Sequence, residues 1–337
     1  MRRVVVVTTG GTIASRWQGA GYAAEAEGRD VLAAAADIPH GVETEVVDLF
    51  TVNSPRLTTT HQLTLLRAVH DVLADPAVDG VVVTHGTDTL EESAFLLDLY
   101  HRDRRPVVFT GAQRPLESED GDAGGNLYDA LLTASAVEDL GTLAVFAGRV
   151  HAARGTVKTQ TIAPDAFADP SHAPVGRVGF GQVQLLRRPD RSEPLDLPDL
   201  DAPLPRVDMV MHHTDADPAL FDAALDAGAR GVVLVATGAG NATPEFTRAV
   251  SRAVQRGVLV ALTTRVPAGP VTPIYTGGGA VDLISAGAVP TGTLRAGQAR
   301  IAVLAALMAS RDTAERTDVL RRITDPVPAG TPATVLV

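Results

Sequence analysis

The stretch VVVVTTGGTIAS, Val4–Ser15, lies close to the start of the chain and joins a run of valines to two adjacent glycines set among threonines. Four consecutive β-branched apolar residues predict a strand that is buried on both faces, as in a parallel sheet. The glycines predict a sharp exit from that strand, which leaves the threonine hydroxyls at its carboxyl end. Three interpretations of this exit are open: a phosphate-binding loop, a loop that presents one hydroxyl for chemistry, or a tight turn without a ligand.

Similar β-branched runs recur through the first half of the chain and alternate with segments whose apolar residues have helical spacing. Helices are predicted over Thr60–Leu73 and Leu90–Tyr100, both as amphipathic helices packed on a sheet. This alternation is typical of βαβ units around a parallel sheet, so the predicted fold class is α/β. The strand candidates are VVVVTT, TEVVDLF, DGVVVTHGT, RPVVFTG and TLAVFAG.

The segment RRPDRSEPLDLPDLDAPLPR, residues 187–206, is rich in proline and aspartate, has no periodicity and predicts an interdomain linker. After it, RVDMVMHHT, ARGVVLVATG and GVLVALTTR again predict strands, with helices at Pro218–Ala227 and Glu245–Gln255. A chain of 337 residues with 45% hydrophobic content is long enough for two cores. We therefore predict a larger N-terminal domain over residues 1–186, with a parallel-rich sheet flanked by helices, and a smaller C-terminal α/β domain over residues 207–337.

The composition narrows the classes of partner. The formal net charge of −11 and the pI near 5.2 argue against nucleic acid, whose phosphates favour clusters of lysine and arginine. Cysteine is absent, which excludes disulfides, thiolate metal sites and cysteine nucleophiles. No apolar run approaches the ~20 residues that span a bilayer, and the valine run after MRR leads into the glycine turn rather than a signal-peptide cleavage site. We expect a cytoplasmic protein with no membrane partner, and a loosely attached tail, DPVPAGTPATVLV, at residues 325–337.

Ligands of open α/β sheets bind outside the carboxyl ends of the strands. The residues that directly follow the predicted strands are Thr8–Ser15, Asn53 and Ser54, His85–Thr89 and Thr110–Arg114. Hydroxyl, amide and carboxylate groups are therefore expected to converge on one edge of the sheet. Neither G-x-x-x-x-G-K-[ST] nor G-x-G-x-x-G is present in the first of these segments, which disfavours the phosphate-binding interpretation.

The segment THGTDTLEES, Thr84–Ser93, places Thr87 and Asp88 at a second glycine turn, which leads into a predicted helix. A carboxylate near a helix N-terminus stays ionised and suits the binding of a substrate ammonium group. The alternative is that Asp88 or Thr89 only caps the helix, which is the commoner role of such a residue. His85 is interpreted as a structural histidine rather than a general base, because no triad partners can be identified for it.

A lysine beside a hydroxyl can activate it without cysteine or histidine, and ARGTVKTQT supplies Lys158 within a run of hydroxyl residues. An uncharged lysine next to a threonine can act as a general base when burial favours its neutral form. The alternative is a solvated surface charge, which is the usual state of lysine. No metal is expected, because the nine histidines are not at ligand spacing and MHHT would direct its two side chains to opposite faces of a strand. No organic cofactor is expected either, because hydrolysis by a hydroxyl nucleophile needs none.

Three motifs in this order, TTGGTIAS, THGTDTLEES and TVKTQT, resemble the bacterial-type L-asparaginase family, which includes the glutaminase-asparaginases. GAQRP, GNLYDAL, ATGAGN and TRVPAG extend the resemblance over nearly the whole chain. The resemblance implies a cytoplasmic amidohydrolase with a larger, catalytic N-terminal domain and a smaller C-terminal α/β domain. It also implies L-asparagine as substrate, L-aspartate as product, and a homotetramer built from intimate dimers that complete the active sites.

Within this resemblance, Thr12 of GGTIA matches the primary nucleophile, which attacks the side-chain amide carbon and releases ammonia. Water then hydrolyses the resulting β-aspartyl-threonine ester to aspartate. The segment SRWQGAGYAAEAEG, Ser15–Gly28, resembles the family's mobile active-site loop, with Tyr22 at the position of the tyrosine that assists the nucleophile. Its small, weakly apolar residues suit a lid that closes over the substrate.

The other matched residues form a second catalytic group and a substrate-binding set. The resemblance implies that Thr87 positions the water or the amide, that Lys158 tunes the Thr87 hydroxyl, and that Asp88 binds the substrate α-ammonium group. Ser54 in VNSPRL resembles the serine that binds the α-carboxylate. Backbone N–H groups around Thr12 and Thr87 are expected as oxyanion donors, since glycine turns leave amides accessible.

The chain also departs from the family pattern. Pro55 stands where periplasmic asparaginases have a glutamine, and Thr243 and Thr276 stand where a neighbouring subunit donates an asparagine and a glutamate. Tyr275 or Asn241 could substitute for the missing glutamate. These departures leave open a preference for L-glutamine or another amino-acid amide. They also leave an alternative of another class, a protein that binds asparagine or aspartate but has lost turnover.

Overall fold

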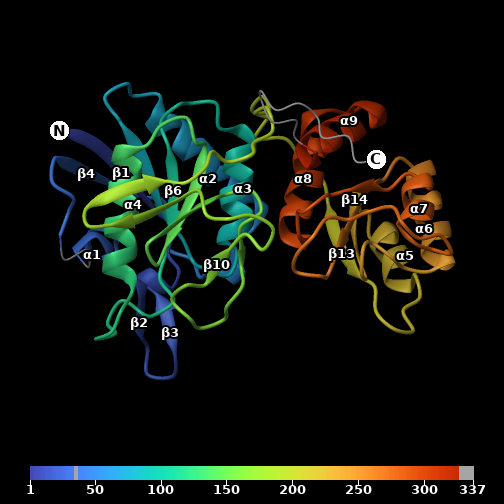
Figure 1. Cartoon of the computed structure of the whole chain (residues 1–337), viewed down its shortest axis with the longest axis horizontal. Coiled ribbons are helices and arrows are strands. Elements are labelled where there is room, and N and C mark those ends of the chain that lie inside the picture. Colours follow the sequence, from blue (N-terminus) through green and yellow to red (C-terminus); the bar gives the residue numbers. More distant parts are fainter. Residues whose placement is uncertain (34–36, 326–337) are drawn as a thin grey trace. The chain divides into compact units, whose positions relative to one another are not determined.

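A computed structural model of the protein describes residues 1–33 and 37–325 (Figure 1). The chain divides into two compact units, Met1–Pro189 and Asp190–Val337. Each unit contains a sheet with packed helices, so the predicted α/β fold in two domains is confirmed. The division falls within the segment predicted as a linker, and the exact domain limits stay a prediction. The predicted loose tail, after Asp325, lies outside the described residues.

The larger unit is built on an eight-stranded sheet in the order β12-β11-β8-β7-β6-β5-β1-β4. The strands from β4 to β7 in this order run parallel, and β8, β11 and β12 continue the sheet antiparallel at one edge. The predicted parallel-rich sheet is therefore confirmed, with an antiparallel extension that was not predicted. The strands span Arg2–Thr8 (β1), Val42–Asp48 (β4), Gly80–Thr84 (β5), Val107–Thr110 (β6), Thr142–Phe146 (β7), Arg149–Ala152 (β8), Gly176–Gly179 (β11) and Gln182–Leu185 (β12).

The order of the parallel strands reverses at β1, because β4 and β5 lie on opposite sides of it. Val4–Val7 of β1 are buried on both faces, which explains why a run of valines forms a central strand. At the carboxyl ends, Thr8 of β1 is paired with Thr84 of β5. Ligands of α/β proteins bind outside the carboxyl ends of strands at such a reversal. The loops that follow Thr8 and Thr84 both begin at this position.

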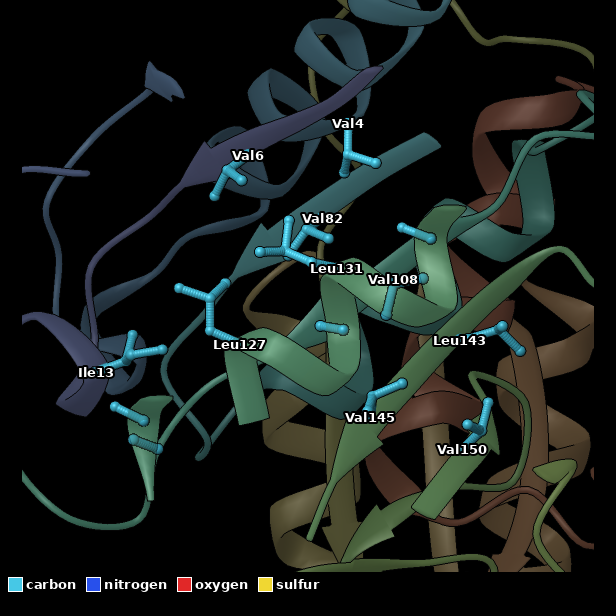
Figure 2. Packing of buried hydrophobic residues seen from close by; sticks show 14 of the residues in the cluster. Val4, Val6, Ile13, Val82, Val108, Leu127, Leu131, Leu143, Val145 and Val150 are labelled. Carbon is cyan, nitrogen blue, oxygen red and sulfur yellow. The ribbon is translucent and has the colours of Figure 1, made fainter. Parts of the chain in front are cut away.

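Helices cover both faces of the large sheet. Val4, Val6 and Val82 of the strands form one buried cluster with Leu127 and Leu131 of α4 (Figure 2). Helix α2 packs against β5, and helix α3 packs against β7. They cover the face opposite to α4, to which every second side chain of these strands points. The helices of this unit are α1 (Gly28–Ala33), α2 (Thr59–Leu73), α3 (Leu90–Tyr100) and α4 (Ala123–Ala136), with the 3₁₀ helices η1 (Thr12–Ala14) and η2 (Ser54–Arg56).

Two of these helices match the predicted segments closely. Helix α2 begins next to the predicted start, because Thr58 caps it by accepting a hydrogen bond from the backbone N–H of His61. Helix α3 has the predicted limits, but the prediction of an amphipathic helix is wrong for it. Its residues are buried all along its length, and within it only Glu91 and Glu92 are partly exposed. Packing on several sides has therefore replaced the solvent-facing side that an amphipathic helix would have.

The smaller unit is built on a parallel sheet in the order β13-β14-β15-β16. The predicted helices are present as α5 and α6, and their side chains Phe221 and Phe246 pack edge to face with ring centroids 6.5 Å apart. Among the described residues, no helix is long and apolar enough to cross a membrane. The elements of this unit are β13 (Val207–Met211), α5 (Ala219–Asp226), β14 (Gly231–Ala236), α6 (Pro244–Gln255), β15 (Leu259–Thr264), α7 (Ala280–Ser285), β16 (Val289–Pro290), α8 (Ala296–Ala309) and α9 (Thr313–Thr324).

Candidate active site

Two glycines turn the chain sharply after β1. Gly10 and Gly11 have φ angles of 91° and 86°, in the left-handed region that glycine adopts without strain. A Cβ atom on Gly11 would lie 2.2 Å from the Cα atom of Gly86, and one on Gly10 would lie 2.5 Å from the backbone nitrogen of Val52. The loop after β1 therefore packs backbone to backbone on the loop after β5, which brings the hydroxyl residues of both loops to the same edge of the sheet.

Thr12 begins the 3₁₀ helix η1 directly after these glycines. The next residue, Ile13, is fully buried in the core of the larger unit (Figure 2). The carbonyl oxygen of Gly11 accepts hydrogen bonds from the N–H of Ala14 and the hydroxyl of Ser15, each at 3.0 Å. Thr12 itself is only partly buried. Ile13, which is anchored in the core, and the hydrogen-bonded turn at Gly11 therefore hold Thr12 at the carboxyl end of β1.

Lys158 contacts two residues of the loop after β5. Its Nζ donates a hydrogen bond to Thr87 Oγ1 at 2.8 Å and forms an ion pair with Asp88 Oδ1 at 2.7 Å. We call these three residues the lysine cluster. Lys158 belongs to the short strand β9 (Val157–Lys158), which pairs with β10 (Phe167–Ala168). Because the Lys158 side chain is only 18% exposed, the alternative of a solvated surface charge is wrong.

Ser54 is 3% exposed and is hydrogen-bonded to the loop that carries Thr87 and Asp88. Its Oγ accepts a hydrogen bond from the Asp88 N–H at 3.2 Å, and its carbonyl oxygen accepts one from the Thr89 hydroxyl at 3.1 Å. Thr89 is the N-cap of α3 but makes no capping bond with its side chain, and the Asp88 carboxylate is bonded to Lys158. The capping alternative is therefore not observed. The Ser54 Oγ accepts the hydrogen bond from the Asp88 N–H, and a hydroxyl can also donate one.

The segment predicted as a mobile loop begins with a β-hairpin, formed by β2 (Ser15–Trp17) and β3 (Tyr22–Ala24), which projects from the larger unit in Figure 1. Tyr22 is 51% exposed. Its ring packs edge to face on Trp17, with ring centroids 5.1 Å apart. The structure thus places Tyr22 on a paired strand, with its ring against Trp17 and not in the lysine cluster.

His85 follows β5 and is buried, with 1% of its surface exposed. Its Nδ1 lies 2.8 Å from the carbonyl oxygen of Gly86, and Nδ1 carries the proton because a carbonyl oxygen only accepts. Burial lowers the pKa of His85 to about 4, so the ring is neutral near neutral pH. This geometry fits the predicted structural role, since the ring holds the loop in which Gly86 packs on Gly11.

Sequence reasoning did not identify Glu91, in the first turn of α3, as a site residue. Its carboxylate accepts a hydrogen bond from the backbone N–H of Lys158 at 2.5 Å. Burial raises the pKa of Glu91 to about 7, and the charge of Glu92 adds to the rise, whereas the Lys158 N–H and the Lys158 charge oppose it. The only signal in the sequence was an acidic residue in the first turn of a helix, which is common and indicates no particular partner.

The residues expected from a neighbouring subunit lie in the smaller unit. Thr243 is the N-cap of α6, and Asn241 forms an isolated β-bridge with Thr237. Tyr275 and Thr276 are both exposed. Their contribution to the site of another subunit stays a prediction.

The site combines two hydroxyls, an amine and a carboxylate. Thr12 and Thr87 follow adjacent parallel strands, and the Lys158 amine is bonded to the second hydroxyl. Such a set can attack a carbonyl carbon and transfer a proton. Within the described part of the chain, no group of three or more histidine, aspartate or glutamate side chains could hold a metal ion.

Comparison with protein families covers both units. The family model described as asparaginase, N-terminal, matches residues 3–191, and the model described as glutaminase/asparaginase C-terminal domain matches residues 206–320. The chain belongs to the asparaginase family. Thr12 and the lysine cluster all lie in the N-terminal asparaginase domain.

Asparaginases from several bacteria are similar over most of the chain. An L-asparaginase of Bacillus licheniformis is 36% identical over 296 residues, which are 86% of this chain and 90% of the relative. A probable L-asparaginase of Deinococcus radiodurans is 34% identical over 332 residues, 96% of this chain and 98% of the relative. The crystal structure of a probable cytoplasmic L-asparaginase from Campylobacter jejuni matches with a TM-score of 0.85 and 26% identity, covering 95% of this chain and 99% of that one. The asparaginase fold therefore extends through both units.

Proposed function

We propose that the protein is an L-asparaginase, which hydrolyses L-asparagine to L-aspartate and ammonia. The observation that carries this proposal is the 2.8 Å hydrogen bond from Lys158 Nζ to Thr87 Oγ1, beside the strand end that carries Thr12. This arrangement supplies one hydroxyl for attack and a second, lysine-bonded hydroxyl for positioning. Relatives that carry the name L-asparaginase support the choice of substrate.

In the proposed reaction, Thr12 Oγ1 attacks the side-chain amide carbon of asparagine and forms a tetrahedral intermediate. The carbon–nitrogen bond then breaks, and the nitrogen leaves as ammonia with the proton that Thr12 gives up. A water molecule adds to the carbon of the resulting ester, which releases aspartate and restores the Thr12 hydroxyl. Backbone N–H groups of the two glycine turns are the proposed donors to the oxyanion in both steps.

The remaining residues bind the substrate and handle protons. Asp88, whose side chain is 54% exposed, uses one oxygen for Lys158 and offers the other to the α-ammonium group of the substrate. Lys158, which is hydrogen-bonded to Thr87 Oγ1, orients and activates the Thr87 hydroxyl, and that hydroxyl positions the water or the amide. The Ser54 hydroxyl donates a hydrogen bond to the α-carboxylate of the substrate. Tyr22 approaches the nucleophile when the β2–β3 hairpin closes over the bound substrate.

Steady-state kinetics of the purified protein with L-asparagine test this proposal. Thr12→Ala and Lys158→Met are each expected to lower kcat by more than about 1,000-fold, since both act on the reacting atoms. Thr64→Ala, at an exposed position of α2, is the control and should keep full activity. Undiminished ammonia release by the Thr12 variant would overturn the assignment of the nucleophile. Tight aspartate binding in calorimetry without hydrolysis of any amide would identify a binding protein instead.

The preference among amides is tested with the same enzyme. Assays with L-glutamine, D-asparagine and a peptide-linked asparagine, run beside L-asparagine, give four values of kcat/KM. We expect the value for L-asparagine to be the largest. A larger value for L-glutamine would identify a glutaminase and would leave the proposed roles of Thr12 and the lysine cluster unchanged.

We further propose a cytoplasmic homotetramer of intimate dimers, in which the smaller unit of one subunit completes the site of another. The support for this arrangement is the family membership and the exposed positions of Tyr275 and Thr276 in the smaller unit. Sedimentation equilibrium should give about four times the chain mass of 35.0 kDa, and cell fractionation should place the activity in the cytoplasm. A fully active monomer would contradict the assembly.

A further inference from the structure

Lys158 is the sole lysine of the chain. One short stretch, residues 87–91, binds both its amine and its backbone N–H. Its amine is bonded to Thr87 and Asp88 in the loop before α3. Its backbone N–H donates to Glu91 Oε2, in the first turn of the same helix, at 2.5 Å. The start of α3 therefore contacts both the main chain and the amine of Lys158.

The strand that carries Lys158 is too short to fix this residue by itself. β9 and β10 have two residues each and form a separate two-stranded sheet. An isolated two-stranded pair is marginally stable. The hydrogen bond from the Lys158 N–H to Glu91 links β9 to α3, whose residues are buried along most of the helix. The position of the Lys158 main chain relative to Thr87 thus depends on Glu91.

Resting on the proposed asparaginase function, we propose that Glu91 is a positioning residue, whose ionised carboxylate holds the Lys158 main chain so that the Lys158 amine meets the Thr87 hydroxyl. A hydrogen bond to an ionised group is about twice as strong as one between neutral groups. A displacement of about 1 Å at a reacting group can lower the rate about 100-fold. Because Glu91 acts through the Lys158 main chain and not on the substrate, its loss lowers kcat and leaves KM nearly unchanged.

The charged groups around Glu91 place its titration near neutral pH. Burial, together with the charge of Glu92 on the same helix, raises the pKa of Glu91 to about 7. Lys158 on β9 lowers the pKa of Glu91, and Asp88 in the preceding loop is paired with the Lys158 amine. Protonation weakens the bond to the Lys158 N–H, so kcat falls as the pH falls through about 7.

Because Lys158 is the single lysine, the hydrogen bond from its backbone N–H to Glu91 can be followed by NMR. Protein labelled with ¹⁵N only at lysine has one lysine amide signal, and we expect its proton shift to titrate with a midpoint near pH 7. Glu91→Gln keeps an oxygen acceptor of the same reach without the charge. It should abolish the titration, lower kcat at pH 8 by about 10-fold, keep KM within about twofold, and remove the fall of kcat on the acid side.

Glu92→Gln is the matched control, because it removes a carboxylate from the adjacent position of the same helix turn. It should keep full kcat at pH 8 and keep the titration of the Lys158 amide, with the midpoint moved to lower pH. Glu91→Asp keeps the charge but is too short to reach the Lys158 N–H. It should lose kcat as Glu91→Gln does, and it serves as the second variant if Glu91→Gln folds poorly.

A folded Glu91→Gln enzyme with the kcat and the pH profile of the wild type would overturn the positioning role, even if the amide titration is lost. Wild-type protein that hydrolyses no amide would refute the proposed function and not the positioning role. In that case the ¹³Cε signal of Lys158 decides: a shift in Glu91→Gln supports the positioning of the amine, and an unchanged signal overturns it.

Discussion

Gly11 and Gly86 lie backbone to backbone at the carboxyl ends of β1 and β5, where a Cβ atom on Gly11 would come 2.2 Å from the Gly86 Cα. Gly11→Ala forces these two loops apart, because backbone atoms on both sides cannot move independently. Thr12 then moves away from Thr87, and we expect kcat to fall by more than about 100-fold. The melting temperature should fall as well. Asparagine kinetics and a thermal melt of the purified variant measure both effects.

The control for this variant is Gly41→Ala. Gly41 has a similar φ angle of 80°, but a Cβ atom there would meet nothing within 4 Å. The substitution should cost about 1 kcal/mol of stability through backbone strain alone and should leave kcat unchanged. If Gly11→Ala behaved like this control in both measurements, close packing of the two loops would not be required for the site.

Asp88→Asn tests the proposed ammonium-binding carboxylate. Asparagine keeps the shape of the side chain and one oxygen, but it removes the charge that pairs with Lys158 at 2.7 Å. We expect KM for L-asparagine to rise about 10- to 100-fold, the cost of a lost hydrogen bond to a charged group. Asp318→Asn, which breaks an exposed ion pair with Arg321, is the control and should leave KM unchanged. Initial rates over a range of substrate concentrations give KM, and an unchanged value for Asp88→Asn would exclude the ammonium-binding role.

The helices show which parts of the fold could be predicted from the sequence. Helix α2 was predictable because Leu63 and Leu66 recur on the face that the structure buries. Helix α4 was not predicted, since it contains adjacent Gly124 and Gly125, each of which disfavours a helix by about 1 kcal/mol. The burial of Leu127 against the sheet outweighs that cost. Helix α8 is buried on nearly all sides, so its sequence has no amphipathic period to detect.

The site was predictable where residues directly follow strands. Thr12 and Thr87 follow neighbouring parallel strands, and the rule for the carboxyl ends of α/β sheets places them together. The bond between Glu91 and Lys158 was not predictable, because it uses a backbone N–H and joins residues 67 positions apart. The hairpin around Tyr22 was also missed, since glycine and alanine suggest a loop, whereas ring packing across the strands stabilises paired structure.

His151 in β8 is a buried group that makes the fold sensitive to acid. It is 3% exposed, and neither ring nitrogen has a hydrogen-bond partner among the described residues. Burial lowers the pKa of His151 to about 4, below its ordinary 6.5. Between these values the unfolded chain binds the proton and the folded protein does not, so the free energy of unfolding falls as the pH falls from 6.5 to 4.

His151→Leu removes this sensitivity and fills the same space with an apolar side chain. We expect its melting temperature to equal or exceed that of the wild type at pH 7. Its advantage in unfolding free energy should grow as the pH is lowered from 6.5, to roughly 3 kcal/mol near pH 4. Thermal melts from pH 4.5 to 7 measure the trend, with His40→Leu at an exposed position as control. An advantage that shrinks on acidification would contradict a buried neutral histidine.

Glu91 has the opposite effect on stability. Its pKa is raised from an ordinary 4.5 to about 7, so between these values the folded protein holds a proton that the unfolded chain has lost. The free energy of unfolding therefore falls as the pH rises from 4.5 to 7, and this loss of stability is complete above pH 7. Glu91→Gln stays neutral at every pH and should be more stable than the wild type by a margin that grows to roughly 3 kcal/mol at pH 8.

Denaturant unfolding at pH 5, 6, 7 and 8 gives this margin, with Glu43→Gln at an exposed position as control. Because Glu91→Gln is also expected to lower kcat, a variant that gains stability at pH 8 while it loses activity would identify the charge of Glu91 as a feature kept for catalysis at the expense of the fold.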